Sequence, residues 1–180
     1  MNLSLSELPE RCDVLVIGAG PAGSAAATVL ARSGLSVVVI DQRSFPREKV
    51  CGDGLIPDAH AALAQLGVLD EVMARAQAAS HVACIGPRGG RIDVPGRLAV
   101  LPRRELDDIV CRGAVRAGAR MHAPVQFDQP LFDASGRVCG AKLSHAQEHR
   151  DIHADWVVLA TGAVPQALMA AGLCERQTPT

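Results

Sequence analysis

Aromatic residues are scarce in this chain of 180 residues, which has no tyrosine, one tryptophan and three phenylalanines. Proteins that bind single-stranded nucleic acid stack its bases on aromatic side chains. Proteins that bind duplexes carry an excess of basic residues on one face. The formal net charge of this chain is −1. The composition therefore excludes nucleic acid as the expected partner.

Long apolar runs are also lacking. No stretch reaches the roughly 18 apolar residues that a membrane-spanning helix needs. Residues 1–12 are acidic and contain no long apolar core, so we do not expect them to act as a signal peptide. We expect no transmembrane segment, and peripheral contact with a membrane stays open.

The cysteines and histidines form no convincing metal-binding pattern. The six cysteines are scattered without a CxxC pair, as is usual for free thiols in a reducing compartment, and this favours a cytoplasmic protein. His145, His149 and His153 are spaced by four and would share one face of a helix, which would suit a metal. Residues 152–156 read as a strand, however, so we predict no metal site.

The chain does contain one complete βαβ pattern. The apolar, β-branched run at residues 14–17 predicts a buried parallel strand. The turn Gly18–Gly23 follows with the spacing GxGxxG, and an alanine-rich helix is expected at about 22–32. A second buried strand at 36–40 ends at Asp41. This order of elements is typical of a dinucleotide-binding site.

Each residue type in this pattern has a physical role. Gly18 permits a sharp turn, Gly20 lets a pyrophosphate approach the backbone, and Gly23 allows the helix to pack closely on the strand. The helix N-terminus offers N–H groups and a positive dipole to phosphates. Asp41 can accept hydrogen bonds from ribose hydroxyls. The pattern alone leaves NAD and FAD both open.

A long loop at residues 42–54 follows Asp41. Loops of this length are usually functional or disordered. Arg43, Arg47 and Lys49 could neutralise a diphosphate, and Gly52 allows the backbone to approach a flat ring. The alternative is a solvated surface loop.

Further elements are predicted downstream. Helical patterns cover residues 57–67 and 68–78, and apolar alternation then predicts a small antiparallel β layer at 80–101. Its short strands are expected at 81–86, 91–94 and 98–101. We interpret this layer as the beginning of a substrate-facing surface.

A third helix is expected at about 102–117, and Arg103 and Asp107 can pair at i, i+4 on it. This pair could be the whole role of Arg103. A last buried strand, before Thr161 and Gly162, is expected to lie beside the first strand and to deliver its loop to the cofactor. The predicted fold class is α/β: a Rossmann-like domain over residues 1–180, with a parallel sheet and the antiparallel layer.

These motifs make the chain similar to the N-terminal half of the geranylgeranyl reductase family of FAD-dependent oxidoreductases. The general part of the resemblance is GAGPAG with Asp41. The specific part is Cys51-Gly52-Asp53-Gly54-Leu55, which looks like the family's CG(D/E)GL loop, where halogenases would be expected to carry a Gly-Glu-Ser type loop. The Arg-x-x-Leu-Asp pattern beginning at Arg103 is also similar.

The resemblance implies FAD as cofactor, with the adenosine on the βαβ unit and the isoalloxazine towards Cys51. It implies reduction of isoprenoid carbon–carbon double bonds on a lipid, with NAD(P)H or another electron donor. It makes Cys51 the candidate catalytic residue and places Arg103 against the flavin nucleotide. The candidate cofactor contacts are Gly18, Gly20, Pro21, Ala22, Gly23, Asp41, Gln42, Arg43, Cys51, Gly52, Asp53, Arg103, Val125, Thr161 and Gly162.

Two departures from the family pattern stand out. The family usually has Ala-Asp-Gly where this chain has Ala160-Thr161-Gly162, so a threonine hydroxyl stands in place of a carboxylate. The family's chains are also about twice as long, and this chain is therefore expected to be a fragment. The alternatives are a flavin-dependent monooxygenase or halogenase, a non-catalytic FAD-binding module and, least favoured, an NAD-dependent dehydrogenase.

Overall fold

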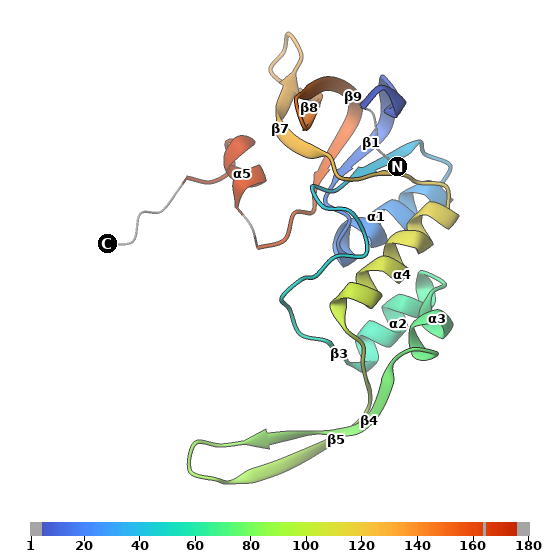
Figure 1. Cartoon of the computed structure of the whole chain (residues 1–180), viewed down its shortest axis with the longest axis vertical. Coiled ribbons are helices and arrows are strands. Elements are labelled where there is room, and N and C mark those ends of the chain that lie inside the picture. The colour runs from blue at the N-terminus through green and yellow to red at the C-terminus, as the bar shows by residue number, and fades with distance from the viewer. Residues whose placement is uncertain (1–4, 164, 176–180) are drawn as a thin grey trace. The chain divides into compact units, whose positions relative to one another are not determined.

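The computed structural model describes residues 5–163 and 165–175. They divide into two compact units, one formed by residues 1–45 with 111–180 and the other by residues 46–110 (Figure 1). The first contains a mainly parallel sheet and the second a small antiparallel one, which confirms the predicted fold class. Within the described ranges, no helix has the length and apolar character needed to cross a membrane.

The first unit is built on a six-stranded sheet of order β6-β2-β1-β9-β8-β7. Its strands are β1 (Arg11–Ile17), β2 (Val37–Ile40), β6 (Arg120–His122), β7 (Gln126–Phe132), β8 (Val138–His145) and β9 (Glu148–Leu159). Val14 of β1 pairs in parallel with Val37 on one side and with Trp156 on the other. The prediction that the last strand returns beside the first is therefore confirmed.

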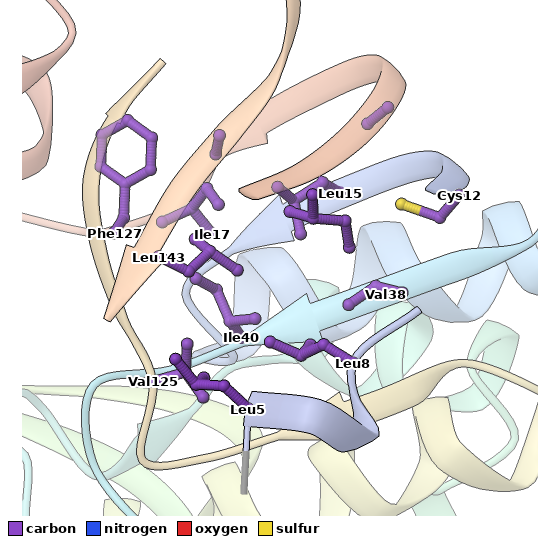
Figure 2. Close-up of a cluster of buried hydrophobic side chains, with 13 residues drawn as sticks. Leu5, Leu8, Cys12, Leu15, Ile17, Val38, Ile40, Val125, Phe127 and Leu143 are labelled. Carbon is purple, nitrogen blue, oxygen red and sulfur yellow. The ribbon is translucent and has the colours of Figure 1, made fainter. Parts of the chain in front are cut away.

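Alternate residues of β1 and β2 supply the two cores of this sheet, because successive side chains of a strand point to opposite faces. On one face, Val14 and Val16 pack with Ala27 of α1 (Pro21–Arg32) and Ala114 in the later part of α4 (Arg103–Arg116). On the other face, Leu15 belongs to a cluster with Leu5 of the turn η1 (Leu5–Glu7) and with side chains of strands β7 to β9 (Figure 2). The short helix α5 spans Gln166–Ala170.

The core of the second unit is formed by three helices, α2, α3 and the first part of α4, and by a three-stranded sheet of order β3-β5-β4. Its elements are β3 (Gly54–Leu55), α2 (Pro57–Gln65), α3 (Leu69–Met73), β4 (Gln77–Ile85), β5 (Arg91–Val100) and the first part of α4. Leu63, Val72, Leu101 and Ile109 are among the residues of its core. Figure 1 shows β4 and β5 as a long ribbon in green.

Two predicted boundaries in this unit are wrong. The helix expected at 68–78 ends at Met73, since Gln77 already pairs with Val100 at the base of the ribbon. The strand expected at 98–101 is the end of β5 and not a separate element. Both errors have the same cause, because pairing between distant segments overrides local propensity.

Candidate functional site

The glycine turn of the first unit lies where three parallel strands end. The Gly18 N–H donates to the Ile40 carbonyl at 2.7 Å, and the Ala160 N–H donates to the Ile17 carbonyl at 2.8 Å. Gly18 has φ +102°, and a Cβ there would lie 2.5 Å from the Ala160 carbonyl oxygen. Only glycine tolerates both the conformation and the contact. The turn is thus held at the carboxyl edge of the sheet, where nucleotides bind in such folds.

Gly23 and Gly20 are required for different reasons. A Cβ at Gly23 would overlap the carbonyl oxygen of Gly18, so glycine there is a demand of the fold itself. Gly20 has φ −66° and ψ −178°, which any residue can adopt. Its backbone gives no reason for glycine, which fits a position that a ligand approaches closely. Gly20 is also the N-cap of α1 and has no side chain with which to cap the first-turn N–H groups of Ala22 and Gly23.

Asp41 contacts the turn directly. Its side chain is 7% exposed, Oδ2 accepts a hydrogen bond from the Ala19 N–H at 3.0 Å, and Oδ1 accepts one from the Arg43 N–H at 3.0 Å. Ser24 Oγ donates to the Ala19 carbonyl at 2.9 Å. The peptide groups on both sides of Ala19 are therefore fixed by buried side chains. Sequence reasoning missed Ser24 and assigned Asp41 only to the ribose.

The remaining candidates of this unit lie around the same edge. Val125 donates its N–H to the Asp41 carbonyl at 2.8 Å, while its side chain is buried in the core. The Thr161 Cα lies 3.3 Å from the position of a Gly18 Cβ, so the loop after β9 does reach the glycine turn. Gly162 has φ +73° with open space around it. The side chains of Gln42 and Arg43 are exposed.

His122 is a buried polar residue near this edge that sequence reasoning did not single out. It is 8% exposed, and its backbone carbonyl accepts the Asp41 N–H at 3.3 Å. Among the described residues, Nδ1 has no hydrogen-bond partner. Burial lowers the pKa of His122 below 6.5, Arg120 lowers it further, and Glu7 opposes the shift. The surroundings of His122 therefore favour the neutral imidazole.

The second unit brings the Cys51 loop to the start of α4. Asp53 Oδ1 accepts the Arg103 N–H at 3.1 Å, and the Asp53 carbonyl accepts the Leu101 N–H at 3.0 Å. Asp53 thereby satisfies one of the N–H groups that a helix start leaves without an intrahelical partner. Cys51, Gly52 and Asp53 are all exposed.

Arg103 is oriented by a buried carboxylate. Asp107 is 0% exposed and accepts Arg103 Nε at 2.7 Å and Nη2 at 3.0 Å, which confirms the predicted i, i+4 pair. Arg47 Nη1 lies 3.3 Å from the same carboxylate, so Arg47 has this internal partner where a diphosphate was expected. The hydrogen bond to Asp107 raises the pKa of Arg103 above its ordinary value, and the thiol of Cys51 adds to the effect.

The metal pattern considered for the histidines does not lie on one helix. His145 ends β8, and His149 and His153 are on β9. His149 Nδ1 lies 3.4 Å from Asp128 Oδ2, and Ser144 Oγ donates to Asp128 Oδ1 at 2.7 Å. No group of three or more metal-ligating side chains was found in the part of the chain that the structure describes.

The first unit has the features of a dinucleotide-binding protein of the Rossmann type. Its turn has no room for a Cβ at Gly18 or Gly23. The N-terminus of α1 has no side-chain cap and suits a pyrophosphate, and the buried acid Asp41 suits a ribose. The comparison with protein families then gives the cofactor. The chain belongs to the FAD binding domain family, whose model matches residues 11–177, and its cofactor is FAD.

Similar proteins include both reductases and halogenases. The chain is 41% identical to a menaquinone reductase of Mycolicibacterium smegmatis over 71% of this chain and 32% of the relative. It is 32% identical to digeranylgeranylglycerophospholipid reductase 2 of Methanopyrus kandleri over 93% of this chain and 41% of the relative. The structure of the myxobacterial chondrochloren halogenase, an FAD-dependent enzyme, superposes with a TM-score of 0.82 at 26% identity, covering 90% and 40% of the two chains.

These comparisons support a relationship to FAD-dependent oxidoreductases. Because halogenases are among the similar proteins, they support the geranylgeranyl reductase resemblance only at that broader level. The chain spans about a third of the length of the menaquinone reductase and 41% of that of the phospholipid reductase.

Proposed function

We propose that this chain is the FAD-binding part of a flavin oxidoreductase that reduces carbon–carbon double bonds of an isoprenoid lipid. The observation that carries the proposal is the 32% identity with a digeranylgeranylglycerophospholipid reductase, which extends over 93% of this chain. The Cys51–Leu55 loop, typical of the geranylgeranyl reductase family, adds support. In this proposal residues 1–180 form the FAD-binding domain, and residues 80–101 begin the substrate-facing β layer.

The reaction requires only a hydride and a proton for each double bond. FAD, when bound in its reduced form, would supply the hydride. Solvent or a nearby acid supplies the proton, so that one carbon gains the hydride and its neighbour the proton. NAD(P)H or another donor returns the electrons.

The residues of the first unit have binding roles. The N–H groups at the start of α1 would contact the pyrophosphate, and Gly20 would leave room for it. Asp41, whose carboxylate accepts the N–H groups of Ala19 and Arg43, would also contact the ribose hydroxyls.

From the family resemblance of Cys51–Leu55 alone, we assign the exposed Cys51 loop to the flavin. Arg103, held by Asp107, would supply a fixed positive charge, and Gly52 would allow close approach of the backbone. The catalytic role proposed for Cys51 is to shape the surroundings of the flavin ring.

A single-turnover experiment tests the reaction. FAD-loaded protein is reduced with dithionite without oxygen, freed of excess reductant, and mixed with a digeranylgeranyl glycerophospholipid. We expect oxidised flavin absorbance to return in step with a lipid product that has gained two hydrogens for each flavin reoxidised. Gly20→Val, which should not hold FAD, is the control. Flavin that stays reduced, with lipid of unchanged mass, would contradict the proposal.

A flavin-dependent halogenase or monooxygenase is the second candidate, favoured by the superposition on the halogenase. It requires oxygen, and the reductase does not. Product that forms only in air and carries added oxygen or halogen would establish it. A third outcome, purified protein that stays colourless after FAD is added, would point to a chain without catalytic function.

A further inference from the structure

Ser24 is a buried polar residue at the start of the alanine-rich helix α1. It follows Gly23 directly and is 1% exposed. The next three residues are alanines, which favour a helix more strongly and bring no hydroxyl that needs a partner. Ser24 Oγ donates to the Ala19 carbonyl at 2.9 Å. A serine at this position is therefore explained by its contact with the glycine turn and not by helix formation.

This contact fixes one peptide plane of the turn. The Ala19 carbonyl and the Gly20 N–H belong to the same peptide group, and a trans peptide holds these two groups on opposite sides. Because the carbonyl is turned inward to Ser24, the N–H of Gly20 points the other way. Ala19 is 0% exposed, whereas Gly20 is half-buried. The Gly20 N–H is thus directed away from the buried side of the turn.

The preceding peptide plane is fixed by a different side chain. Asp41 Oδ2 accepts the Ala19 N–H at 3.0 Å. The Gly18 carbonyl lies in the same plane, and its oxygen fills the space that a Cβ of Gly23 would need. Asp41 therefore orients the first plane of the turn, and Ser24 orients the second. The direction of the Gly20 N–H depends on Ser24.

Glycine at position 20 makes this restraint necessary. A glycine has little steric preference, so the peptide between Ala19 and Gly20 can rotate at low cost when nothing holds its carbonyl. Pro21 has no N–H, and the donors at this start of α1 are those of Gly20, Ala22 and Gly23. Losing the direction of one of these donors would weaken the hold on a phosphate.

We propose that Ser24 is a positioning residue for the pyrophosphate of FAD. Its hydroxyl holds the Ala19–Gly20 peptide in the orientation in which the Gly20 N–H donates to a phosphate oxygen. Ser24 itself stays buried and acts only through the turn. The proposal rests on FAD as the cofactor and is independent of the reaction that the flavin performs. The competing explanation is a structural role in which Ser24 only satisfies a buried carbonyl.

The amide proton of Gly20 tests the proposal in the unsubstituted protein. An N–H that donates to a phosphate oxygen forms a charge-assisted hydrogen bond, which is short and deshields its proton. The FAD-free form of the whole chain, labelled with 15N, is titrated with ADP and with adenosine, which has no phosphate. We expect a downfield shift of the Gly20 proton with ADP and little change with adenosine. A Gly20 proton that saturating ADP leaves unmoved would overturn the proposal.

Ser24→Ala then tests the cause. Alanine suits the helix, and the variant loses only the hydroxyl. The Kd for FAD and for ADP should rise about tenfold or more, which corresponds to one lost hydrogen bond to a charged group. The Kd for adenosine should change little, and the Gly20 shift with ADP should shrink. An equal loss of affinity for ADP and adenosine would indicate the structural role and refute the positioning role.

Thr28→Val is the matched control. Thr28 is also 1% exposed and lies one turn further along α1, where its Oγ1 donates to the Ser24 carbonyl at 2.8 Å. Valine has the same branched shape, and the hydroxyl that it removes makes this contact within the helix. The Kd for FAD should therefore stay unchanged even if urea unfolds the variant more easily. Equal weakening of FAD by Thr28→Val and Ser24→Ala would overturn the proposal, and so would an unsubstituted protein that does not bind ADP.

Discussion

Replacing Asp41 by alanine should damage the protein in two separable ways. The carboxylate accepts hydrogen bonds from the N–H groups of Ala19 and Arg43, and the first of these bonds is buried. Alanine removes both acceptors and leaves the Ala19 N–H without a partner at a site where water has little access. The glycine turn is therefore weakened before any cofactor is considered.

The magnitude follows from the two bonds. A buried donor without a partner costs about 1–3 kcal/mol, and the partly buried bond to Arg43 contributes about 0.5–1.5 kcal/mol. The free energy of unfolding of the FAD-free protein should therefore fall by about 2–4 kcal/mol. Asp41→Asn keeps one acceptor oxygen and should lose about half as much.

Urea unfolding of the FAD-free protein and fluorescence titration with FAD measure the two effects. If Asp41 also accepts the ribose hydroxyls, FAD affinity should fall by a further 1–3 kcal/mol or so, which is about five- to 150-fold in Kd. Asp58→Ala, an exposed acid on α2, is the control and should stay within about 0.5 kcal/mol. A loss below about 1 kcal/mol in FAD-free Asp41→Ala would refute the structural role.

Three further predictions concern single side chains. Gly20→Val should yield folded protein that binds no FAD, because φ −66° suits valine but its side chain would occupy the diphosphate position; yellow protein with full flavin content would contradict this. The pKa of His122 is lower in the folded protein than in the unfolded chain, so the unfolded chain takes up the proton first as the pH falls. The contribution of His122 to the free energy of unfolding should therefore be full above about pH 6.5 and should decline below it. In urea unfolding at several pH values, His122→Gln should flatten this dependence. The control His149→Gln, at an exposed histidine, should leave it unchanged. If the free energy of unfolding has the same slope against pH in both variants, His122 is not the cause. Asp107→Ala should cost about 3–5 kcal/mol in urea unfolding, since it removes the buried carboxylate from the largely buried side chains of Arg103 and Arg47. A loss under about 1 kcal/mol would contradict this account.

The βαβ unit could be predicted from the sequence because its determinants are local. β-Branched residues at 14–17, the glycine spacing and the acid at position 41 lie within one short stretch, and each acts on its neighbours. The pairing of β9 beside β1 was also predictable, because the apolar end of β9 resembles β1 and such runs favour a parallel sheet. The structure confirms both. The expected burial of that end of β9 is wrong, since Trp156 is 68% exposed and residues 157–159 are only half-buried.

The ribbon and the inner contacts of the site were not predictable in the same way. The extent of β4 depends on Gln77 meeting Val100, which no local pattern records. The partner of Arg47 is a carboxylate 60 positions away, although the burial of Asp107 could have been suspected from its place beside Leu106 on the apolar side of α4. Ser24 carried a weaker signal, a hydroxyl in the first turn of a helix otherwise rich in alanine.

The two acids that sequence reasoning assigned to the cofactor both have a structural partner as well. Asp41 binds the Ala19 N–H, and Asp53 binds the Arg103 N–H. Loss of FAD from an alanine variant at either position would therefore follow from a disordered loop as readily as from a lost ligand contact. The asparagine variants separate the two causes, because the amide keeps an acceptor for the backbone while removing the negative charge. An Asp41→Asn protein that loses only about half the stability lost by Asp41→Ala, yet binds FAD much more weakly, is the result that would assign the ribose to this carboxylate.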